Sequence, residues 1–246
     1  MLNYEEIRKA AERIESGDYD IIEPSKLANY IDHTNLNAFA GKSDLEKLAK
    51  EALEFKFFSV CVNPVNVKAV KEFLGSSDVK VCSVVGFPLG QNTLEIKLRE
   101  AERAVEDGAD EVDMVINIGR LKDKEYDYVG SEIAGVKKII GDRILKVIIE
   151  TCYLTDDEKV MGTKLCTESG ADFVKTSTGF GKAGATVYDV LILHNTATGK
   201  IKVKAAGGIR TYEDALKMIK AGASRLGASR SVEIVKGTGS STGSQY

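Results

Sequence analysis

Histidine and paired cysteine are scarce in this sequence. Its 246 residues include two histidines, His33 and His194, and four cysteines, none of which form a C-x-x-C motif. Because zinc sites need such ligands at short, regular spacings, a zinc enzyme is disfavoured and we expect no metal. Both histidines are expected to be structural. Cys61, Cys82 and Cys152 lie in or at the end of strand-like runs, where a reduced cysteine packs as a small apolar side chain.

The chain also lacks an excess of charge and a long apolar run. Its 34 basic and 37 acidic residues give a formal net charge of −3, so we expect no nucleic-acid or membrane-surface partner. Residues 1–20 are charged throughout and lack the apolar core of a signal peptide, and no apolar run approaches the length of a membrane span. These absences predict a cytoplasmic protein.

Short β-rich runs alternate with longer amphipathic runs along the chain. The expected strands are 27–33, 57–62, 79–85, 111–116, 145–150, 172–176, 202–205 and 224–227. The expected helices between them are 43–55, 93–106, 126–140, 155–169, 186–195 and 211–221. Two of these helices open on apparent capping boxes, SDLE (43–46) and TYED (211–214). Eight strands alternating with helices predict a parallel α/β sheet closed into a (β/α)8 TIM barrel.

The ends of the chain differ from this repeat. An additional helix is expected over residues 3–16, before the first strand, where it would cap the bottom of the barrel. Residues 237–246 are polar and low in complexity, so we expect a flexible tail there. The barrel is accordingly predicted to be one domain over residues 1–236.

Two lysines lie near the C-terminal ends of apolar strand-like runs and precede small residues and glycines. Lys175 belongs to ADFVKTSTGF (171–180) and Lys204 to IKVKAAGGIR (201–210). Desolvating an ammonium group is costly, so a lysine at such a position suggests a use. Two lysines in neighbouring strands would lower each other's pKa, and a neutral amine attacks carbonyl groups. The pair therefore indicates Schiff-base chemistry.

Polar residues gather at the expected C-terminal ends of the strands, where barrels of this kind form their active sites. Strand alternation places Asp113 on the same face as Glu111, and it turns Lys146 toward the barrel, where it could pair with Asp113 or Asp32. A structural network of ion pairs could also explain these charges, but their number at one end favours catalysis. The strand-end set is Asp32, Cys61, Asp113, Lys175, Lys204 and Ser229.

The loops expected after strands seven and eight indicate a phosphate site, which this fold usually builds there. They read AGGIR (206–210) and GASRS (227–231). Glycines let backbone N–H groups approach an anion, although each alone could simply form a turn. The residues that could contact phosphate are Gly207, Gly208, Gly227, Ser229, Arg210 and Arg230. In the preceding loop, Thr178 could bind a substrate hydroxyl and Gly179 permits close approach.

The chain resembles the deoxyribose-phosphate aldolase family over nearly its whole length. The matching segments are DHTNL (32–36), VCVNP (60–64), GFPLG (86–90), GADEVDMVINIG (108–119), LKVIIETCYL (145–154), ADFVKTSTGF (171–180), VKAAGGIR (203–210) and GASR (227–230). The resemblance implies a class I aldolase that reversibly cleaves 2-deoxy-D-ribose 5-phosphate to D-glyceraldehyde 3-phosphate and acetaldehyde. It implies no cofactor and no metal. Barrels of this type are commonly homodimers or homotetramers, so we expect a homo-oligomer.

The resemblance also implies a role for each matching residue. Lys175 would be the Schiff-base nucleophile, and Lys204 would be the neighbouring ammonium that keeps Lys175 partly neutral. Asp113 would take part in proton relay, through a water molecule. The residues that would bind the substrate or its phosphate are Asp32, Cys61, Thr178, Gly179, Gly207, Gly208, Gly227 and Ser229.

Two departures and two alternatives accompany the resemblance. The family commonly has a second serine after the position of Ser229, where this chain has Arg230, and residues 192–195 replace a more basic, Met-containing helical segment. A different Schiff-base aldolase or an isomerase acting on a sugar phosphate would share the phosphate loops. A barrel that only binds a phosphorylated metabolite, as a sensor or scaffold, would share them too.

Overall fold

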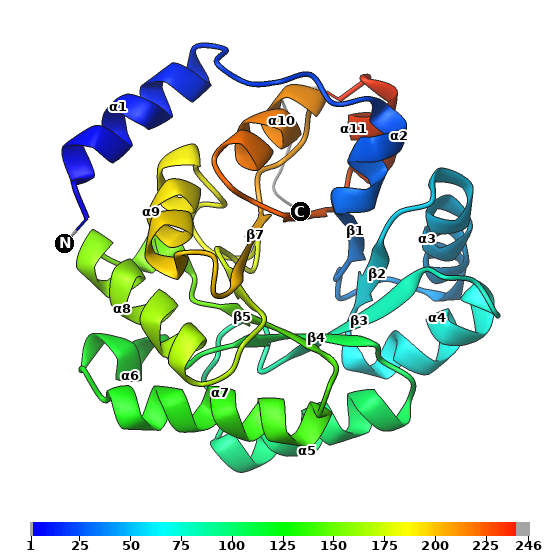
Figure 1. Ribbon diagram of the computed structural model, residues 1–246. Helices are drawn as coiled ribbons and strands as arrows, with labels where there is room; N and C mark the ends of the chain where they lie inside the picture. The colour runs from blue at the N-terminus through cyan, green and yellow to red at the C-terminus, as the bar shows by residue number, and fades with distance from the viewer. Residues whose placement is uncertain (1, 240–246) are drawn as a thin grey trace.

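A computed structural model describes residues 2–239 and contains a closed barrel of parallel strands (Figure 1). Each strand pairs with its neighbours in chain order, and the last strand closes on the first. The strands are β1 Ile31–Asn35, β2 Ser59–Val62, β3 Lys80–Val85, β4 Glu111–Val115, β5 Ile144–Ile148, β6 Phe173–Lys175, β7 Lys202–Ala206 and β8 Arg225–Ala228. The predicted TIM barrel is therefore confirmed.

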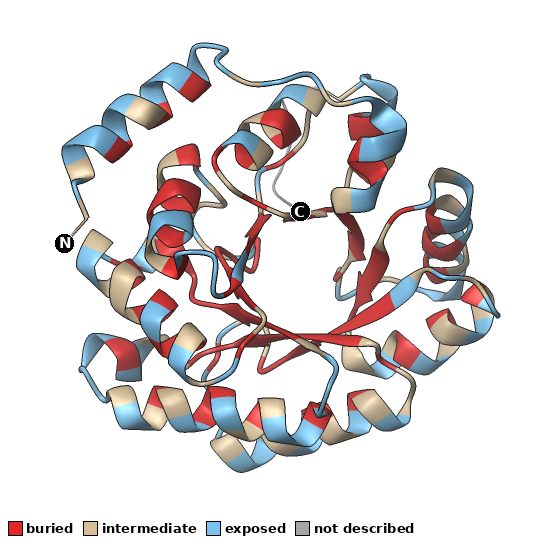
Figure 2. Cartoon of the chain, viewed as in Figure 1, coloured by how far each residue is buried: buried red, intermediate tan, exposed pale blue. Residues whose placement is uncertain are grey.

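Helices surround the barrel as an outer ring (Figure 1). The α-helices are α1 Tyr4–Glu15, α2 Pro24–Leu27, α3 Lys42–Phe55, α4 Val67–Leu74, α5 Leu94–Glu106, α6 Ile118–Lys122, α7 Tyr126–Ile140, α8 Asp156–Glu168, α9 Val187–Ala197, α10 Tyr212–Lys220 and α11 Ser231–Lys236. Short 3-10 helices are η1 Ala28–Tyr30, η2 Pro64–Asn66 and η3 Thr151–Tyr153. Figure 2 shows buried residues along the strands and on the helix faces turned toward them.

Both faces of the strands are buried, as expected for a parallel sheet covered by helices. In β4, Val112 and Met114 belong to the apolar core between strands and helices, whereas Asp113 contacts lysines of β5, β6 and β7. Alternation along the strand therefore places apolar side chains outside the barrel and polar ones inside it. The predicted parity of β4 is confirmed.

The chain before β1 is helical rather than extended, so the prediction of a strand beginning at residue 27 is wrong. Pro24 opens α2 at a position where its fixed φ and missing N–H suit a helix. The 3-10 helix η1 continues to Tyr30, and the strand begins only at Ile31. Three short helices, α4, α6 and α11, were also absent from the prediction.

Helix α1 exists as predicted, but it does not cap the bottom of the barrel. It packs on the outside of the ring against α9 and α10 (Figure 1). Its buried residues Ile7, Ala11 and Ile14 recur at helical spacing, so they form one apolar stripe that faces a neighbouring helix. The Tyr4 hydroxyl donates to Asp157 at 2.7 Å, which adds a tie to α8.

One predicted capping box is confirmed and the other is displaced. Thr211 accepts from the N–H of Asp214, whose carboxylate accepts from the N–H of Thr211, both at 3.0 Å. In the SDLE segment the helix begins at Lys42, one residue earlier than expected. There the Asp44 carboxylate accepts from the N–H of Gly41 at 2.8 Å, so Gly41 rather than Ser43 precedes the first turn.

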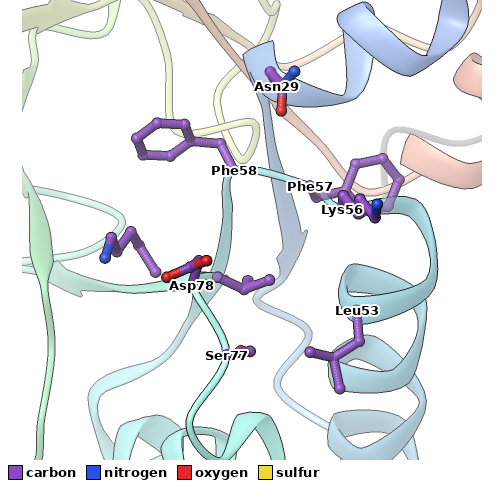
Figure 3. Close-up of a pocket in the computed structure, with 9 residues that line it drawn as sticks. Asn29, Leu53, Lys56, Phe57, Phe58, Ser77 and Asp78 are labelled. Carbon is purple, nitrogen blue, oxygen red and sulfur yellow. The ribbon is translucent and has the colours of Figure 1, made fainter.

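The N-terminal end of the barrel has a groove of about 510 Å³ (Figure 3). Its lining includes residues just before β2 and β3, such as Phe58 and Val79. The guanidinium of Arg225 lies over the Phe58 ring, 3.4 Å from its centroid, beneath the barrel interior. This groove lies at the opposite end of the strands from the predicted catalytic loops.

Two further predictions concern membrane-spanning segments and the C-terminal tail. Within residues 2–239, none of the helices combines the length and the apolar composition that crossing a bilayer requires. Of the tail predicted to be flexible, residues 240–246 lie outside the described part of the chain.

Candidate active site

A single carboxylate at the centre of the barrel joins lysines from three strands. Asp113 Oδ2 accepts from the Nζ atoms of Lys175 and Lys204, both at 2.7 Å. Asp113 Oδ1 accepts from Lys146 Nζ, also at 2.7 Å. The register explains this convergence, because Lys175 lies opposite Lys204 and Asp113 lies opposite Lys146 on adjacent strands. The predicted pair of lysines is thus brought together on one oxygen.

Asp32 of β1 forms a second centre beside the first. Its Oδ2 accepts from Lys204, and its Oδ1 accepts from Ser59 Oγ at 2.7 Å and from Arg225 at 2.8 Å. Lys146 lies 3.8 Å from Asp32 Oδ2, so the expected pairing of Lys146 is direct with Asp113 and longer with Asp32. Lys204 therefore bridges the two aspartates.

A deeper layer of charge lies toward the start of the strands. Glu111 Oε2 lies 2.7 Å from Lys146 and 3.1 Å from Arg225. Glu111 was placed on the inner face by sequence, but Arg225 was missed because it opens β8 directly after a turn. The available signal was the position of Arg225 inside the predicted strand 224–227, where a buried arginine needs carboxylate partners.

The cluster carries more positive than negative groups within the part of the chain that the structure describes. Its carboxylates are Asp32, Glu111 and Asp113, and its bases are Lys146, Lys175, Lys204 and Arg225. These side chains are buried. An unbalanced charge in a water-poor interior is unfavourable, so loss of one proton from a lysine would balance the cluster.

The electrostatics fix most of these protonation states. Burial raises the pKa of Asp113, but Lys146, Lys175 and Lys204 outweigh burial and hold it well below its usual range. Burial lowers the pKa of Lys204, yet Asp113 and Asp32 outweigh it, and the pKa stands above its ordinary value. Burial also lowers the pKa of Lys146, but the surrounding carboxylates and Cys82 outweigh burial and raise it well above its ordinary value. Asp113 is therefore a carboxylate, and Lys204 and Lys146 are ammonium groups.

Two thiols line the same interior. Cys61 and Cys82 are register partners on β2 and β3, and Cys82 Sγ lies 3.1 Å from Asp113 Oδ1. With Asp113 they form a group whose potential ligand atoms all lie within 4.8 Å of one another. A cation placed there would face the ammonium groups that already bind Asp113, and this repulsion opposes metal binding.

The loop after β6 is held by a residue that sequence reasoning missed. The Glu150 carboxylate accepts from the Thr178 hydroxyl at 2.5 Å and from its N–H at 3.2 Å. Glu150 follows β5 with a left-handed φ of 54°, and burial raises its pKa. The glutamate at the end of LKVIIE was visible in the sequence, but nothing there placed it under the loop that follows Lys175.

The predicted phosphate loops meet at the C-terminal end of the barrel. Gly207 and Gly208 follow β7 with φ of 81° and 80°, a conformation that glycine adopts readily. A Cβ on Gly207 would lie 3.3 Å from Gly179 Cα, so the loops after β6 and β7 are in close contact. Ser229 is exposed just after β8, and Arg230 beside it is half-buried.

Gly227 differs from the other predicted phosphate residues, because it lies within β8 rather than in the loop. A Cβ there would lie 3.2 Å from Lys204 Cε and 3.0 Å from Ala206 Cβ. Its lack of a side chain therefore leaves room for Lys204 in the barrel interior. Asp32, Cys61, Asp113, Lys175 and Lys204 share that interior, and the remaining predicted residues lie at or near its mouth.

Comparisons with known proteins agree on one family. Residues 26–245 match the DeoC/LacD family of aldolases. A deoxyribose-phosphate aldolase of Thermococcus kodakarensis is 58% identical over 216 residues, which cover 86% of this chain and 96% of the relative. One of Clostridium perfringens is 53% identical over 217 residues, covering 88% and 97%. The tetrameric deoxyribose phosphate aldolase of Aeropyrum pernix superposes with a TM-score of 0.80 at 33% identity, over 94% of this chain and 95% of that one. The chain therefore belongs to the deoxyribose-phosphate aldolases, a family of lyases.

Proposed function

We propose that this chain reversibly cleaves 2-deoxy-D-ribose 5-phosphate to D-glyceraldehyde 3-phosphate and acetaldehyde through a Schiff base on Lys175. The observation that carries the proposal is the buried cluster in which Lys175 and Lys204 each lie 2.7 Å from one oxygen of Asp113. Membership of the family supports deoxyribose phosphate as the substrate. Neither a cofactor nor a metal enters the proposed reaction.

We assign the neutral amine to Lys175, because it has the fewest carboxylate partners of the three lysines in the cluster. Lys146 lies between Asp113 and Glu111, and Lys204 lies between Asp113 and Asp32, so each ammonium is stabilised by two nearby carboxylates. Lys175 contacts Asp113 alone and stands at the end of β6, where the barrel opens to its loops. A neutral Lys175 would also remove the excess of positive charge in the cluster.

The chemistry follows from a neutral amine at that place. Lys175 Nζ attacks the C1 aldehyde of the open-chain sugar, and loss of water from the carbinolamine leaves a protonated imine. The imine withdraws electrons as the C3 hydroxyl loses its proton and the C2–C3 bond breaks, which releases C3–C5 as glyceraldehyde 3-phosphate and leaves C1 and C2 on Lys175 as the enamine. Protonation of the remaining enamine and hydrolysis of the imine release acetaldehyde and restore the amine.

Asp113 and Lys204 are placed to move these protons. Asp113 contacts both lysines through one oxygen, so a proton lost by one amine can be taken up within the same hydrogen-bonded group, directly or through water. General acid–base catalysis of this kind contributes about 10²- to 10⁴-fold. Cys61 and Asp32 would line the pocket for the reacting carbons.

Phosphate binding would position the sugar from its far end. We assign this role to Gly207, Gly208 and Ser229, with Gly179 from the adjoining loop and Gly227 beneath them, and we assign to Thr178 the binding of a substrate hydroxyl. Binding energy gained at the phosphate, away from the bond that breaks, can orient the aldehyde toward Lys175. A different sugar phosphate would be favoured instead if deoxyribose 5-phosphate were cleaved no faster than other phosphorylated aldoses.

The protein is further proposed to be a cytoplasmic homodimer or homotetramer with one barrel domain over residues 1–236. The tetrameric relative of Aeropyrum pernix supports an oligomer. Free thiols at Cys61, Cys82, Cys152 and Cys166 suit a reducing compartment.

The test is to trap the imine. The protein is incubated with acetaldehyde, reduced with borohydride and digested, and the mass of the peptide that carries Lys175 is measured. An ethyl group is expected on Lys175, and the Lys175→Met variant should show no such adduct. An unmodified Lys175 in protein that still cleaves deoxyribose 5-phosphate would rule out the assigned nucleophile.

A further inference from the structure

His33 connects three elements around the loop that follows β8. Its Nδ1 lies 2.9 Å from Ser231 Oγ, at the start of α11, and its Nε2 lies 2.9 Å from Glu51 Oε2, on α3. His33 itself is the residue of β1 that follows Asp32. It is 3% exposed and Ser231 is fully buried, so water cannot easily replace either contact.

Ser231 also bonds to the residue that precedes the loop. Ser231 Oγ lies 2.9 Å from the carbonyl oxygen of Ala228, the last residue of β8. Ala228 is in turn the register partner of His33 across the β1–β8 pair. Both ends of the segment 228–231 are therefore held against β1, and Ser229 lies between them.

The hydrogen-bond donors and acceptors define how the histidine is held. Burial lowers the pKa of His33, which favours the neutral ring with one N–H. The Glu51 carboxylate only accepts, so that N–H belongs on Nε2; Nδ1 is then an acceptor, and it shares the single proton of the Ser231 hydroxyl with the carbonyl oxygen of Ala228. Glu51 thus fixes the ring in the state that can receive the serine proton.

The set of serine, histidine and glutamate has the residue types of a nucleophilic triad, but its burial argues for another role. A nucleophile must be reached by its substrate, and the Ser231 hydroxyl is covered and engaged with Ala228. None of the three residues is among those that contact Asp113. What they can do is to fix the position of the short loop that carries Ser229.

We propose that His33 and Ser231, with Glu51 behind them, are positioning residues for the phosphate-binding loop after β8. They would set the affinity for the phosphate end of the substrate without touching the reacting atoms. The proposal rests on the phosphate role assigned to that loop in the proposed function. These residues would affect recognition of the substrate rather than the chemical step, since Lys175 lies two strands away from β8, on β6.

The Ser231→Ala variant tests the proposal with two substrates, 2-deoxyribose 5-phosphate and unphosphorylated 2-deoxyribose. Losing one buried hydrogen bond that orders the loop should raise KM for the phosphorylated sugar about 5- to 10-fold. The kcat for that sugar, and kcat/KM for unphosphorylated deoxyribose, should fall much less. A general loss of structure would instead lower kcat/KM for both sugars by similar factors.

Ser131→Ala is the matched control, because the Ser131 hydroxyl also donates to a backbone carbonyl, that of Asp127, but at an exposed position of helix α7. It should leave the preference for the phosphorylated sugar unchanged. Glu51→Ala and Glu51→Gln provide a second route that leaves the buried serine intact. The alanine should weaken phosphate discrimination in the same direction as Ser231→Ala, and the glutamine, whose amide oxygen still accepts from Nε2, should restore most of it.

The outcomes are distinct. Selective loss of affinity for the phosphorylated sugar in Ser231→Ala and Glu51→Ala supports the proposal. Equal losses on both sugars, or unchanged preference in both variants, overturn it. If the unaltered protein itself does not prefer the phosphorylated sugar, the phosphate site of the proposed function fails first, and the present proposal fails with it.

Discussion

Two groups of buried charge in this protein have similar contacts and different surroundings. Lys97 of α5 and Glu132 of α7 are both fully buried, and their charged atoms lie 2.6 Å apart. Lys97 also donates to the carbonyl oxygen of Val115 at 2.9 Å, and Glu132 accepts from the N–H of Asn117 at 2.9 Å. This outer pair therefore ties two helices to the end of β4. The inner cluster around Asp113 has equally short contacts, but it lies inside the barrel.

The difference between the two groups is the balance of charge. The outer pair sets one cation against one anion, and backbone groups occupy further positions around both. In the inner cluster four bases share three carboxylates, and the base with the fewest partners, Lys175, stands at the end of its strand. Burial of charge alone does not distinguish the two groups, whereas the unbalanced charge at the open end of the barrel supports the proposed reactive site there.

Replacing Lys175 should have the largest effect on activity, and it should show most clearly how the inner cluster differs from the outer pair. The Lys175→Met variant removes the proposed nucleophile, and we expect cleavage of deoxyribose 5-phosphate to fall at least about 10⁴-fold, since no covalent intermediate can form. The variant should fold, because the remaining bases and carboxylates of the cluster are then equal in number. The measurement is kcat by a coupled assay for glyceraldehyde 3-phosphate, together with a thermal unfolding curve.

The matched control is Lys97→Met, the same substitution in the outer pair. The fraction of that variant that remains folded should turn over at close to the normal rate. Comparable losses of turnover in both variants would mean that buried lysines support activity only through the fold.

Asp113→Asn should have the next largest effect. It keeps the shape of the side chain but removes the charge that three lysines share, and with it the proposed acceptor for the transferred protons. We expect kcat to fall about 10²- to 10⁴-fold. Borohydride trapping on Lys175 would report separately whether the imine still forms.

A control for Asp113→Asn is Glu111→Gln, which removes a carboxylate from the deeper layer of the same cluster. Its effect on kcat should be clearly smaller, because Glu111 contacts Lys146 and Arg225 but neither Lys175 nor Lys204. Equal effects of the two variants would assign the loss to total charge rather than to the position of Asp113.

In the outer pair the expected effect is on stability and not on chemistry. Lys97→Met leaves Glu132 buried without its partner, and this should lower the free energy of unfolding by about 3–5 kcal/mol. The double variant Lys97→Met with Glu132→Leu should recover most of that loss, since no unpaired charge remains. Denaturant titration of the three proteins checks this, and a double variant as unstable as the single one would contradict it.

The positions of the residues proposed to react could be predicted from sequence, because their placement follows from local rules. Alternation along a strand fixed the inward direction of Asp113 and Lys146, and the position of active sites at the C-terminal strand ends identified Lys175 and Lys204. Family resemblance then supplied their proposed roles. The structure confirms the placement of all four inside the barrel.

What escaped prediction depends on contacts between distant segments. Arg225 reaches Asp32 and Glu111 across the closure of β8 on β1, and Glu150 reaches Thr178 in the loop of the next strand. Helix α1 has an apolar stripe that could cover the barrel end or another helix, and only the packing against α9 decides between them. Periodicity shows which face of a segment is buried, but not against what.

The smallest expected difference concerns acid stability. The pKa of Asp32 lies below its ordinary value of 3.8, because Lys204, Lys146 and Arg225 together outweigh the effect of burial. A carboxylate whose pKa is lowered on folding stabilises the protein above the unfolded pKa, and that contribution is lost as pH falls below about 3.8 toward the folded value. In this window Asp32 should account for a slope of about 1.4 kcal/mol per pH unit in the free energy of unfolding.

The Asp32→Asn variant should reduce the slope of unfolding free energy against pH by that amount at acid pH, whereas Asp142→Asn, at an exposed position, should leave the slope nearly unchanged. Unfolding by denaturant from about pH 5 to about pH 2 measures the slopes; equal slopes in the two variants would show that the inner cluster does not hold Asp32 ionised.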